Sequence, residues 1–232
     1  MSALSHEETV AKLLECIKAH VPFDGWSETA FRAAIAESGI EPTLARAACP
    51  RGAVDLALAF HEEGDQAMLA RIEATDMNAL RFRDRVAAAV RFRLEAVEDR
   101  ELVRRGTTLF ALPQYAPDGA KAIWKTCDRI WTALGDTSED YNWYTKRATL
   151  SGVYGSTVLF WLGDGSERLQ ASWDFLDRRI DDVMQIEKVK SAVRKNPLLS
   201  PLLKGTELVL SGLRAPGAQR MSGLPGTTSS RR

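Results

Sequence analysis

Apolar side chains recur every three or four residues along most of the chain, and this spacing limits the possible folds more than any other feature. In "ALRFRDRVAAAVRFRLEAVEDRELVRR" it places Val86, Val90 and Leu94 on one stripe. The segments "AIWKTCDRIWTAL" and "LQASWDFLDRRIDDVMQIEKVKSAV" repeat the pattern. Such spacing is typical of one face of a helix, whereas strands alternate with a period of two. We find no such alternation and no hairpin signal, so we predict an all-α protein.

Residues 1–63 predict a helix-turn-helix module. Ser5 and Glu8 have the spacing of a capping box for a first helix. Ser27 can cap a later helix that ends at Gly39, and a short helical segment follows that glycine. A helix, a glycine turn and a second short helix form the outline of this module.

The rest of the chain divides by composition. Residues 64–195 contain the longer helical patterns and form a second, helical domain. Residues 196–214 are apolar and sparsely charged, and they are interrupted by Pro201 and Gly205. Residues 215–232 are rich in Gly, Ser, Pro and Arg, which predicts a disordered tail.

Charge opposes nucleic-acid binding. The whole chain carries 31 basic and 31 acidic residues, so it has no general attraction to phosphate. Between residues 21 and 63 the module carries seven acidic residues against three arginines. Since affinity for duplex DNA depends largely on neutralising phosphates, we expect a module that does not read DNA. A ligand-responsive repressor that reads DNA is the alternative.

We find no pattern that indicates catalysis or a metal site. The histidines are His6, His20 and His61, and none has a His or Glu partner at metal-ligand spacing. We interpret "HEE" at 61–63 as a solvated helix end. The sequence therefore predicts a protein that is not an enzyme, with neither catalytic residues nor a metal.

Residues 136–164, "DTSEDYNWYTKRATLSGVYGSTVLFWLGD", predict one long apolar helix with Thr137 and Asp140 at its N-terminal cap. Within it a stripe of small side chains is formed by Thr145, Ala148, Gly152 and Gly155. Each glycine costs about 1 kcal/mol relative to alanine in a helix interior. The stripe fits a closely packed neighbouring helix as well as it fits an apolar ligand, and the sequence alone leaves both open.

Large apolar residues around this stripe exceed what one helix pair needs, and we interpret them as the wall of a lipid cavity. The predicted lipid-binding residues are Trp124, Trp131, Ala148, Leu150, Gly152, Val153, Tyr154, Gly155, Val158, Trp161, Trp173 and Leu176. At the start of the helix, Trp143 and Tyr144 lie beside Arg147. Aromatic residues and arginine are typical of interaction hot spots, although an aromatic anchor at the domain rim fits equally well.

The segment 136–164, followed by "SWDFLDRRIDDVMQIEKVK", resembles the ubiquinone-biosynthesis accessory protein family, the ninth member of the Coq series. The resemblance is strongest from Leu112 to Lys190, and "NWYTKR" is its most specific part. It implies a fold similar to the TetR regulators, with a homodimer and a helix-turn-helix module that is not used on DNA. It also implies that residues 64–195 bind an isoprenoid lipid and dimerise.

The same resemblance implies a non-catalytic accessory protein. Family members bind ubiquinone intermediates at the membrane and present them to the di-iron demethoxyubiquinone hydroxylase. The expected ligand is therefore an isoprenoid lipid or quinone intermediate, without any other cofactor. The patch that meets the hydroxylase corresponds here to Asp140, Asn142, Trp143, Tyr144, Lys146 and Arg147.

The family also attaches to membranes through a C-terminal amphipathic helix, and residues 198–213 occupy that place. The expected membrane-binding residues are Leu198, Leu199, Leu202, Leu203, Leu208, Val209, Leu210 and Leu213. The first twenty residues show no secretory or import pattern. We therefore expect a cytoplasmic protein on the inner face of a bacterial cell membrane, or on the matrix side of a mitochondrial one for a mature eukaryotic chain.

Overall fold

The computed structural model describes residues 4–195, with the surroundings of side chains up to residue 185. The helices are α1 (His6–Lys18), α2 (Val21–Asp24), α3 (Glu28–Ser38), α4 (Pro42–Ala48), α5 (Ala53–Glu73), α6 (Phe82–Glu95), α7 (Arg100–Phe110), α8 (Ala116–Ala133), α9 (Tyr141–Gly163) and α10 (Gln170–Lys195). Short 3-10 turns lie at Met77–Ala79 and Glu167–Leu169. No strand occurs in residues 4–195, so the predicted all-α class is confirmed.

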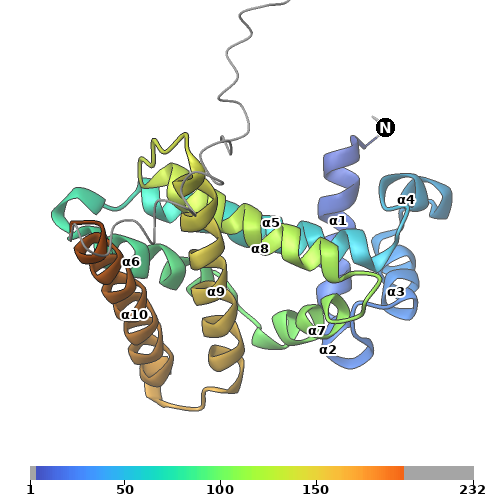
Figure 1. The fold of residues 1–232 in the computed structure, drawn as a ribbon. Coiled ribbons are helices and arrows are strands. Elements are labelled where there is room, and N and C mark those ends of the chain that lie inside the picture. The colour runs from blue at the N-terminus through green and yellow to red at the C-terminus, as the bar shows by residue number, and fades with distance from the viewer. Residues whose placement is uncertain (1–3, 196–232) are drawn as a thin grey trace, which may run out of the picture.

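The helices form an elongated molecule with two ends. Helices α1 to α4 lie at one end, and α6, α9 and α10 lie at the other (Figure 1). Between them α5 and α8 run side by side, and α7 packs against both α2 and α8. The long helices α5 and α8 therefore connect the N-terminal module with the rest of the chain.

The N-terminal module forms as its caps predict. The Ser5 hydroxyl accepts a hydrogen bond from the Glu8 amide, and the Glu8 carboxylate accepts one from the Ser5 amide, which completes the capping box. Ser27 caps α3 through the Ala30 amide, and Gly39 turns the chain with a φ of 65°. This φ lies in the left-handed region that glycine adopts without strain. The predicted order of helix, glycine turn and short helix is confirmed.

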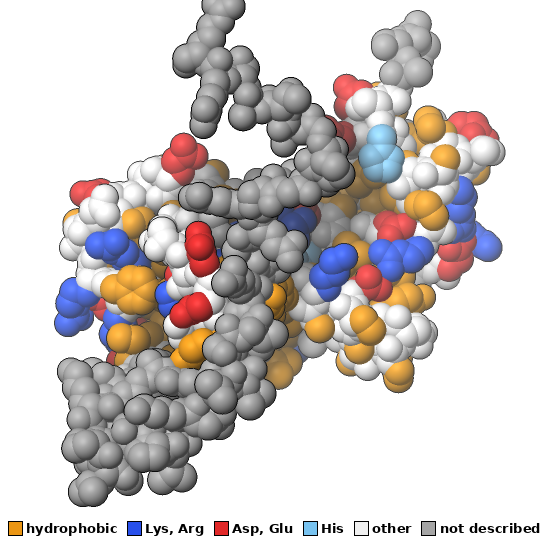
Figure 2. Space-filling view, turned by 45° about the horizontal axis from the view of Figure 1, so that its top comes forward, with side chains coloured by type: hydrophobic (Ala, Val, Ile, Leu, Met, Phe, Trp, Pro, Cys, Tyr) orange, Lys and Arg blue, Asp and Glu red, His pale blue; other side chains and the backbone are white. Residues whose placement is uncertain are grey.

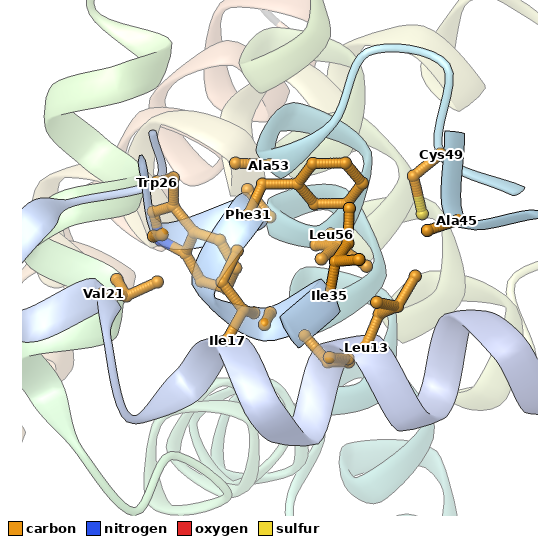
Figure 3. Close-up of a cluster of buried hydrophobic side chains, with 14 of the residues drawn as sticks. Leu13, Ile17, Val21, Trp26, Phe31, Ile35, Ala45, Cys49, Ala53 and Leu56 are labelled. Atoms are coloured by element: carbon orange, nitrogen blue, oxygen red, sulfur yellow. The ribbon is translucent and has the colours of Figure 1, made fainter. Parts of the chain in front are cut away.

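A first hydrophobic core holds the module together. Side chains from α1, α3 and α5 converge in it, including Leu13, Ile17, Phe31 and Leu56, which are all fully buried (Figure 3). Trp26 joins them and donates from Nε1 to the carbonyl oxygen of Leu102 at 3.0 Å. That bond ties the module to α7.

The boundary expected at residue 63 needs correction. Residue 63 lies in the middle of α5, which runs without a break from Ala53 to Glu73. On this one helix Leu56 belongs to the first core and Met68 to the second. The interpretation of residues 61–63 as a solvated helix end is wrong for the same reason. The module and the second domain share a helix instead of a linker.

A second core fills the other end of the molecule. Its buried members come from α5, α6, α8, α9 and α10 and include Met68, Ile72, Val86, Val90, Leu94, Ile130, Leu150, Val153, Trp161, Trp173, Leu176 and Ile180. Burying a large apolar side chain contributes about 1.5–3 kcal/mol relative to exposing it. This core therefore accounts for most of the spaced apolar positions that the sequence predicts for the long helices.

The start of α9 differs from the expected cap. Asp140 is the N-cap, and its carboxylate accepts from the Asn142 amide at 2.9 Å. Thr137 lies outside the helix and does not cap it. Residues 136–138, which precede the helix, are held away from its first turn because Lys146 donates to Asp136 and to Ser138, each at 2.7 Å.

Two of the predicted segments, residues 196–214 and 215–232, lie outside the described residues, and so do all the expected membrane contacts from Leu198 to Leu213. Among the described helices, none combines the length and apolar character needed to cross a membrane.

Two glycines in helix interiors predict opposite effects when alanine replaces them. A Cβ atom at Gly64 would overlap the guanidinium group of Arg93, whereas a Cβ at Gly152 would meet nothing within 4 Å. We expect Gly64→Ala to lose about 1–3 kcal/mol of unfolding free energy, because Asp65 holds the Arg93 side chain in place and it cannot easily move away from the added methyl group. Gly152→Ala should gain about 0.5–1 kcal/mol through helix propensity. Urea unfolding measures both, and equal stabilities would contradict the tight packing at Gly64.

Candidate functional site

A cavity of about 440 Å³ lies where helices α5 to α9 meet. Its wall contains Trp26, Ala57, Phe60, His61, Arg93, Leu94, Val97, Leu102, Val103, Gly106, Thr107, Phe110, Ala111, Gly119, Ala120, Ala122, Ile123, Tyr154, Gly155, Val158 and Leu159. Most of these side chains are apolar, and the volume falls within the range of about 300–1,000 Å³ that is usual for ligand pockets. Ala111, Ala120 and Leu159 are exposed and mark the mouth of the cavity. The arrangement suits a largely apolar molecule.

Behind one part of this wall lies a buried polar network centred on Asp65. Its carboxylate is fully buried and accepts from Arg93 Nε at 2.7 Å, Thr126 Oγ1 at 2.9 Å and Arg129 Nη1 at 2.8 Å. A buried charge is costly unless it is paired and hydrogen-bonded. Asp65 therefore compensates the charge that Arg93 would otherwise bring to the cavity wall.

His61 joins the same network in its neutral form. Its Nε2 lies 2.7 Å from Thr126 Oγ1. Because the Thr126 hydroxyl gives its single proton to Asp65, His61 is the donor in this pair. Burial, followed by the nearby charge of Arg93, lowers the pKa of His61 to about 4. The imidazole is therefore uncharged at neutral pH.

The structure separates the residues that we predicted to bind lipid. Tyr154, Gly155 and Val158 line the cavity. Trp131, Leu150 and Val153 line a second hollow of about 250 Å³ between α6, α9 and α10. The others reach neither space: Trp161, Trp173 and Leu176 belong to the second core, Trp124 packs against aromatic neighbours, and Ala148 and Gly152 are exposed on α9.

The small-residue stripe on α9 is not covered by another described helix. A Cβ atom built at Gly152 or at Gly155 has no neighbouring atom within 4 Å. Close helix packing, one of the two explanations left open by the sequence, is therefore not found at these positions among the described residues. Of the two glycines, Gly155 reaches the cavity.

The opposite wall of the cavity was missed by sequence reasoning. It is formed by Trp26, Phe60 and one face of α7, from Leu102 to Phe110. These residues are distant in the sequence, so no spacing along a single helix brings them together. The i, i+4 spacing of Leu102, Gly106 and Phe110 was the one available local signal.

An aromatic cluster, defined as Trp124, Trp143 and Tyr144, joins α8 to the first turn of α9. The ring centroids of Trp143 and Tyr144 are 4.8 Å apart and meet edge to face. Trp124 lies 5.9 Å from Trp143 and 6.4 Å from Tyr144. All three side chains are half-buried, so each combines a packed surface with an exposed one.

The structure corrects the expected position of Arg147. Its side chain is only 2 % exposed, with Nε 2.5 Å from Asp128 and Nη1 3.0 Å from Asp136. The guanidinium carbon lies 4.0 Å from the ring centroid of Trp143. One turn after Trp143, Arg147 faces α8 instead of solvent. It supports the aromatic cluster from beneath and exposes almost none of its own side chain.

Lys146 and Asp136 form the edge of this region. Lys146 Nζ lies 2.7 Å from Asp136 and 5.3 Å from the Trp131 ring centroid. Burial favours protonation of Asp136, but hydrogen bonds from Lys146, Ser138 and Arg147 outweigh it and lower its pKa to about 2. Asp136 is therefore ionised at neutral pH. Beside it, Asp140 is exposed and Asn142 is half-buried.

Comparison with known sequences gives the following matches. The sequence model of the COQ9 family matches residues 116–187. "Ubiquinone biosynthesis protein COQ9, mitochondrial" of Rattus norvegicus is 37 % identical over 90 residues, which cover 39 % of this chain and 29 % of the rat protein. The Drosophila melanogaster protein of that name is 30 % identical over 186 residues, covering 78 % and 57 %. The Homo sapiens protein is 26 % identical over 202 residues, covering 82 % and 62 %. The chain thus spans less than two thirds of each of these relatives.

Among solved structures, a TetR transcriptional regulator from Nitrosomonas europaea ATCC 19718 has a similar fold. Its TM-score is 0.61 at 18 % identity, and the match covers 74 % of this chain and 95 % of that one. At this identity the likeness concerns the fold alone. The predicted TetR-like fold and the resemblance to the COQ9 family are both confirmed.

The buried pairs of Arg147 predict a large loss of stability when its charge is removed. We expect Arg147→Met to lower the free energy of unfolding by about 3 kcal/mol or more, because it removes the buried guanidinium that pairs with both Asp128 and Asp136 and leaves Lys146 as the remaining charged partner of Asp136. Arg32→Met is the matched control. Arg32 pairs with Glu28 on α3 but is 75 % exposed, so its loss should cost less than about 1 kcal/mol. Chemical denaturation of both variants tests this, and similar losses would contradict the structural role of Arg147.

Proposed function

We propose that this relative of the COQ9 proteins acts in ubiquinone biosynthesis as a non-catalytic accessory protein that binds isoprenoid quinone intermediates. The single observation that carries the proposal is the apolar cavity of about 440 Å³ in a chain similar to proteins named for ubiquinone biosynthesis. An isoprenoid chain is a branched hydrocarbon, which suits a wall that includes Phe60, Phe110 and Val158. Burial of one five-carbon unit contributes on the order of 3–4 kcal/mol.

The polar groups near the cavity support binding instead of catalysis. His61 donates to Thr126, and Asp65 accepts from three donors. A general base or a nucleophile needs a free lone pair directed at the substrate. The Asp65 lone pairs are engaged in these bonds and His61 Nε2 is occupied as a donor, so neither of these atoms acts as a base on a ligand in the cavity.

The second part of the proposal is that the protein presents its ligand to the di-iron demethoxyubiquinone hydroxylase. The surface for this partner comprises the exposed parts of Trp143 and Tyr144 together with Asp140, Asn142 and Lys146. Tryptophan and tyrosine are enriched at hot spots because they combine apolar area with hydrogen bonding. Arg147 lies beneath this surface and holds Trp143 in place.

Membrane attachment and dimerisation belong to the same proposal. The apolar segment 198–213 carries seven leucines and one valine. These are too few to span a bilayer, and they suit a location at its surface. We propose a homodimer that binds peripherally to the membrane in which the quinone is made.

Electrostatics oppose the alternative of a TetR-like repressor. The three arginines of residues 21–63 are all bound to carboxylates. Arg32 and Arg46 pair with Glu28, and Arg51 pairs with Asp55 and Asp118. On the face shown in Figure 2, basic side chains of the N-terminal end lie next to acidic ones. The neighbouring carboxylates cancel the positive charge that would attract phosphate, so we do not propose a DNA-binding role.

The cavity predicts which glycine controls lipid binding. We expect Gly155→Leu to place a bulky side chain in the cavity and to reduce at least severalfold the isoprenoid or phospholipid that co-purifies with the protein. Gly152→Leu is the matched control, because Gly152 lies outside the cavity on the same helix. Mass spectrometry of organic extracts measures the bound lipid. Wild-type protein that carries no lipid, or equal loss in both variants, would contradict the proposed cavity.

The aromatic cluster predicts a separation between partner affinity and stability. Trp143→Ala should weaken hydroxylase binding about thirtyfold, which corresponds to roughly 2 kcal/mol. Its stability loss should stay below the ~3–5 kcal/mol expected for a core tryptophan, because Trp143 is half-buried. Trp173→Ala supplies that comparison, since Trp173 is 6 % exposed in the second core.

Melting curves and affinities are measured on the same preparations. If Trp143→Ala destabilises as much as Trp173→Ala and leaves the affinity per folded molecule unchanged, Trp143 is a packing residue and the partner surface lies elsewhere.

A further inference from the structure

The hydroxyl group of Tyr154 is the starting observation. The Tyr154 side chain is 4 % exposed, and its hydroxyl makes no hydrogen bond within the described residues. Among the described residues, the polar side-chain atoms that are completely enclosed and lack a partner are Arg105 Nε, Trp161 Nε1 and Arg179 Nε. The Tyr154 hydroxyl is not one of them. The hydroxyl therefore reaches an accessible surface. Because Tyr154 lines the cavity and is otherwise buried, that surface is the cavity itself.

The other polar side chains of the wall have partners within the protein. Trp26 donates to the Leu102 carbonyl and Thr107 donates to the Val103 carbonyl, each at 3.0 Å. His61 is bound to Thr126 and Arg93 to Asp65. Each of these described wall side chains makes at least one hydrogen bond within the protein, whereas Tyr154 makes none, so its hydroxyl is left for a ligand. A ligand with an oxygen acceptor can therefore complete the hydrogen bonding of this hydroxyl.

We propose that the cavity binds its ligand head inward, with an uncharged, oxygen-bearing head hydrogen-bonded to the Tyr154 hydroxyl. The apolar chain then extends toward the mouth at Ala111, Ala120 and Leu159. This inference rests on the proposed function, because it assumes that the cavity binds an isoprenoid. It adds the residue that recognises the head and the orientation of the ligand.

The charges around the cavity do not suit a ligand with an ionic head group. Arg93, the charged residue nearest to the inner wall, is already compensated by Asp65 at 2.7 Å. Burial raises the pKa of Tyr154, so its hydroxyl is neutral and keeps its proton as a donor. A phosphate placed here would be desolvated without a free counter-charge. The chemical class is therefore a prenylated quinone or phenol, and not a prenyl diphosphate or the headgroup of a phospholipid.

Two probes with the same prenyl chain test this inference on the full-length chain. The first is a benzoquinone that carries two isoprenoid units, and the second is benzene that carries the same chain. We expect wild type to bind the quinone three- to tenfold more tightly, which is the effect of one net hydrogen bond. Tyr154→Phe should weaken quinone binding by the same factor and leave the hydrocarbon unaffected. Tyr115→Phe, at a tyrosine outside the cavity wall, is the matched control.

The outcomes distinguish this inference from the proposed function. If wild type binds neither probe, the lipid-binding proposal fails and the inference with it. If both probes bind but Tyr154→Phe leaves the quinone affinity unchanged, lipid binding stands and the head-inward orientation is overturned. Geranyl diphosphate that binds as tightly as the quinone would overturn the uncharged head. Melting curves show whether Tyr154→Phe is folded, and the hydrocarbon affinity shows whether its cavity is intact.

Discussion

The fully buried carboxylate of Asp65 is the interaction on which the rest of the structure depends. It accepts from Arg93 on α6 and from Thr126 and Arg129 on α8, so a single residue of α5 fixes the positions of two neighbouring helices. Removing one partner from such a buried group costs several kcal/mol, which makes the junction unlike a surface salt bridge. His61 and Arg93 extend from this junction into the cavity wall, and the shape of the site therefore depends on it.

The local features of the fold could be predicted from the sequence, because their causes lie within a few residues. The caps at Ser5 and Ser27 and the turn at Gly39 each depend on a hydrogen bond or a dihedral angle inside one segment. The caps were harder to predict where distant charges intervene. At the start of α9, Asp136 binds both Lys146 and Arg147 and holds the chain away from the cap expected at Thr137.

The candidate site could be predicted only in part. Tyr154, Gly155 and Val158 were found because they share one helix with a visible spacing. Trp26 and Phe110 were not found, since they meet these residues only after the module folds back onto α7 and α8. The sequence places Arg147 at the surface because arginine beside Trp143 and Tyr144 is typical of a hot spot. In the structure Arg147 is buried, because it pairs with two carboxylates from other segments. Spacing along one helix cannot report which neighbour will face it.

The shared helix α5 makes the N-terminal module part of the cavity. Trp26 and Phe60, which belong to the first core or pack against it, are also part of the cavity wall. The outward side of α4, where Leu44 is 42 % exposed, contributes nothing to that wall. A substitution on the outward side of α4 can therefore leave the cavity unchanged, whereas a substitution at Trp26 or Phe60 alters the cavity and the N-terminal core at the same time.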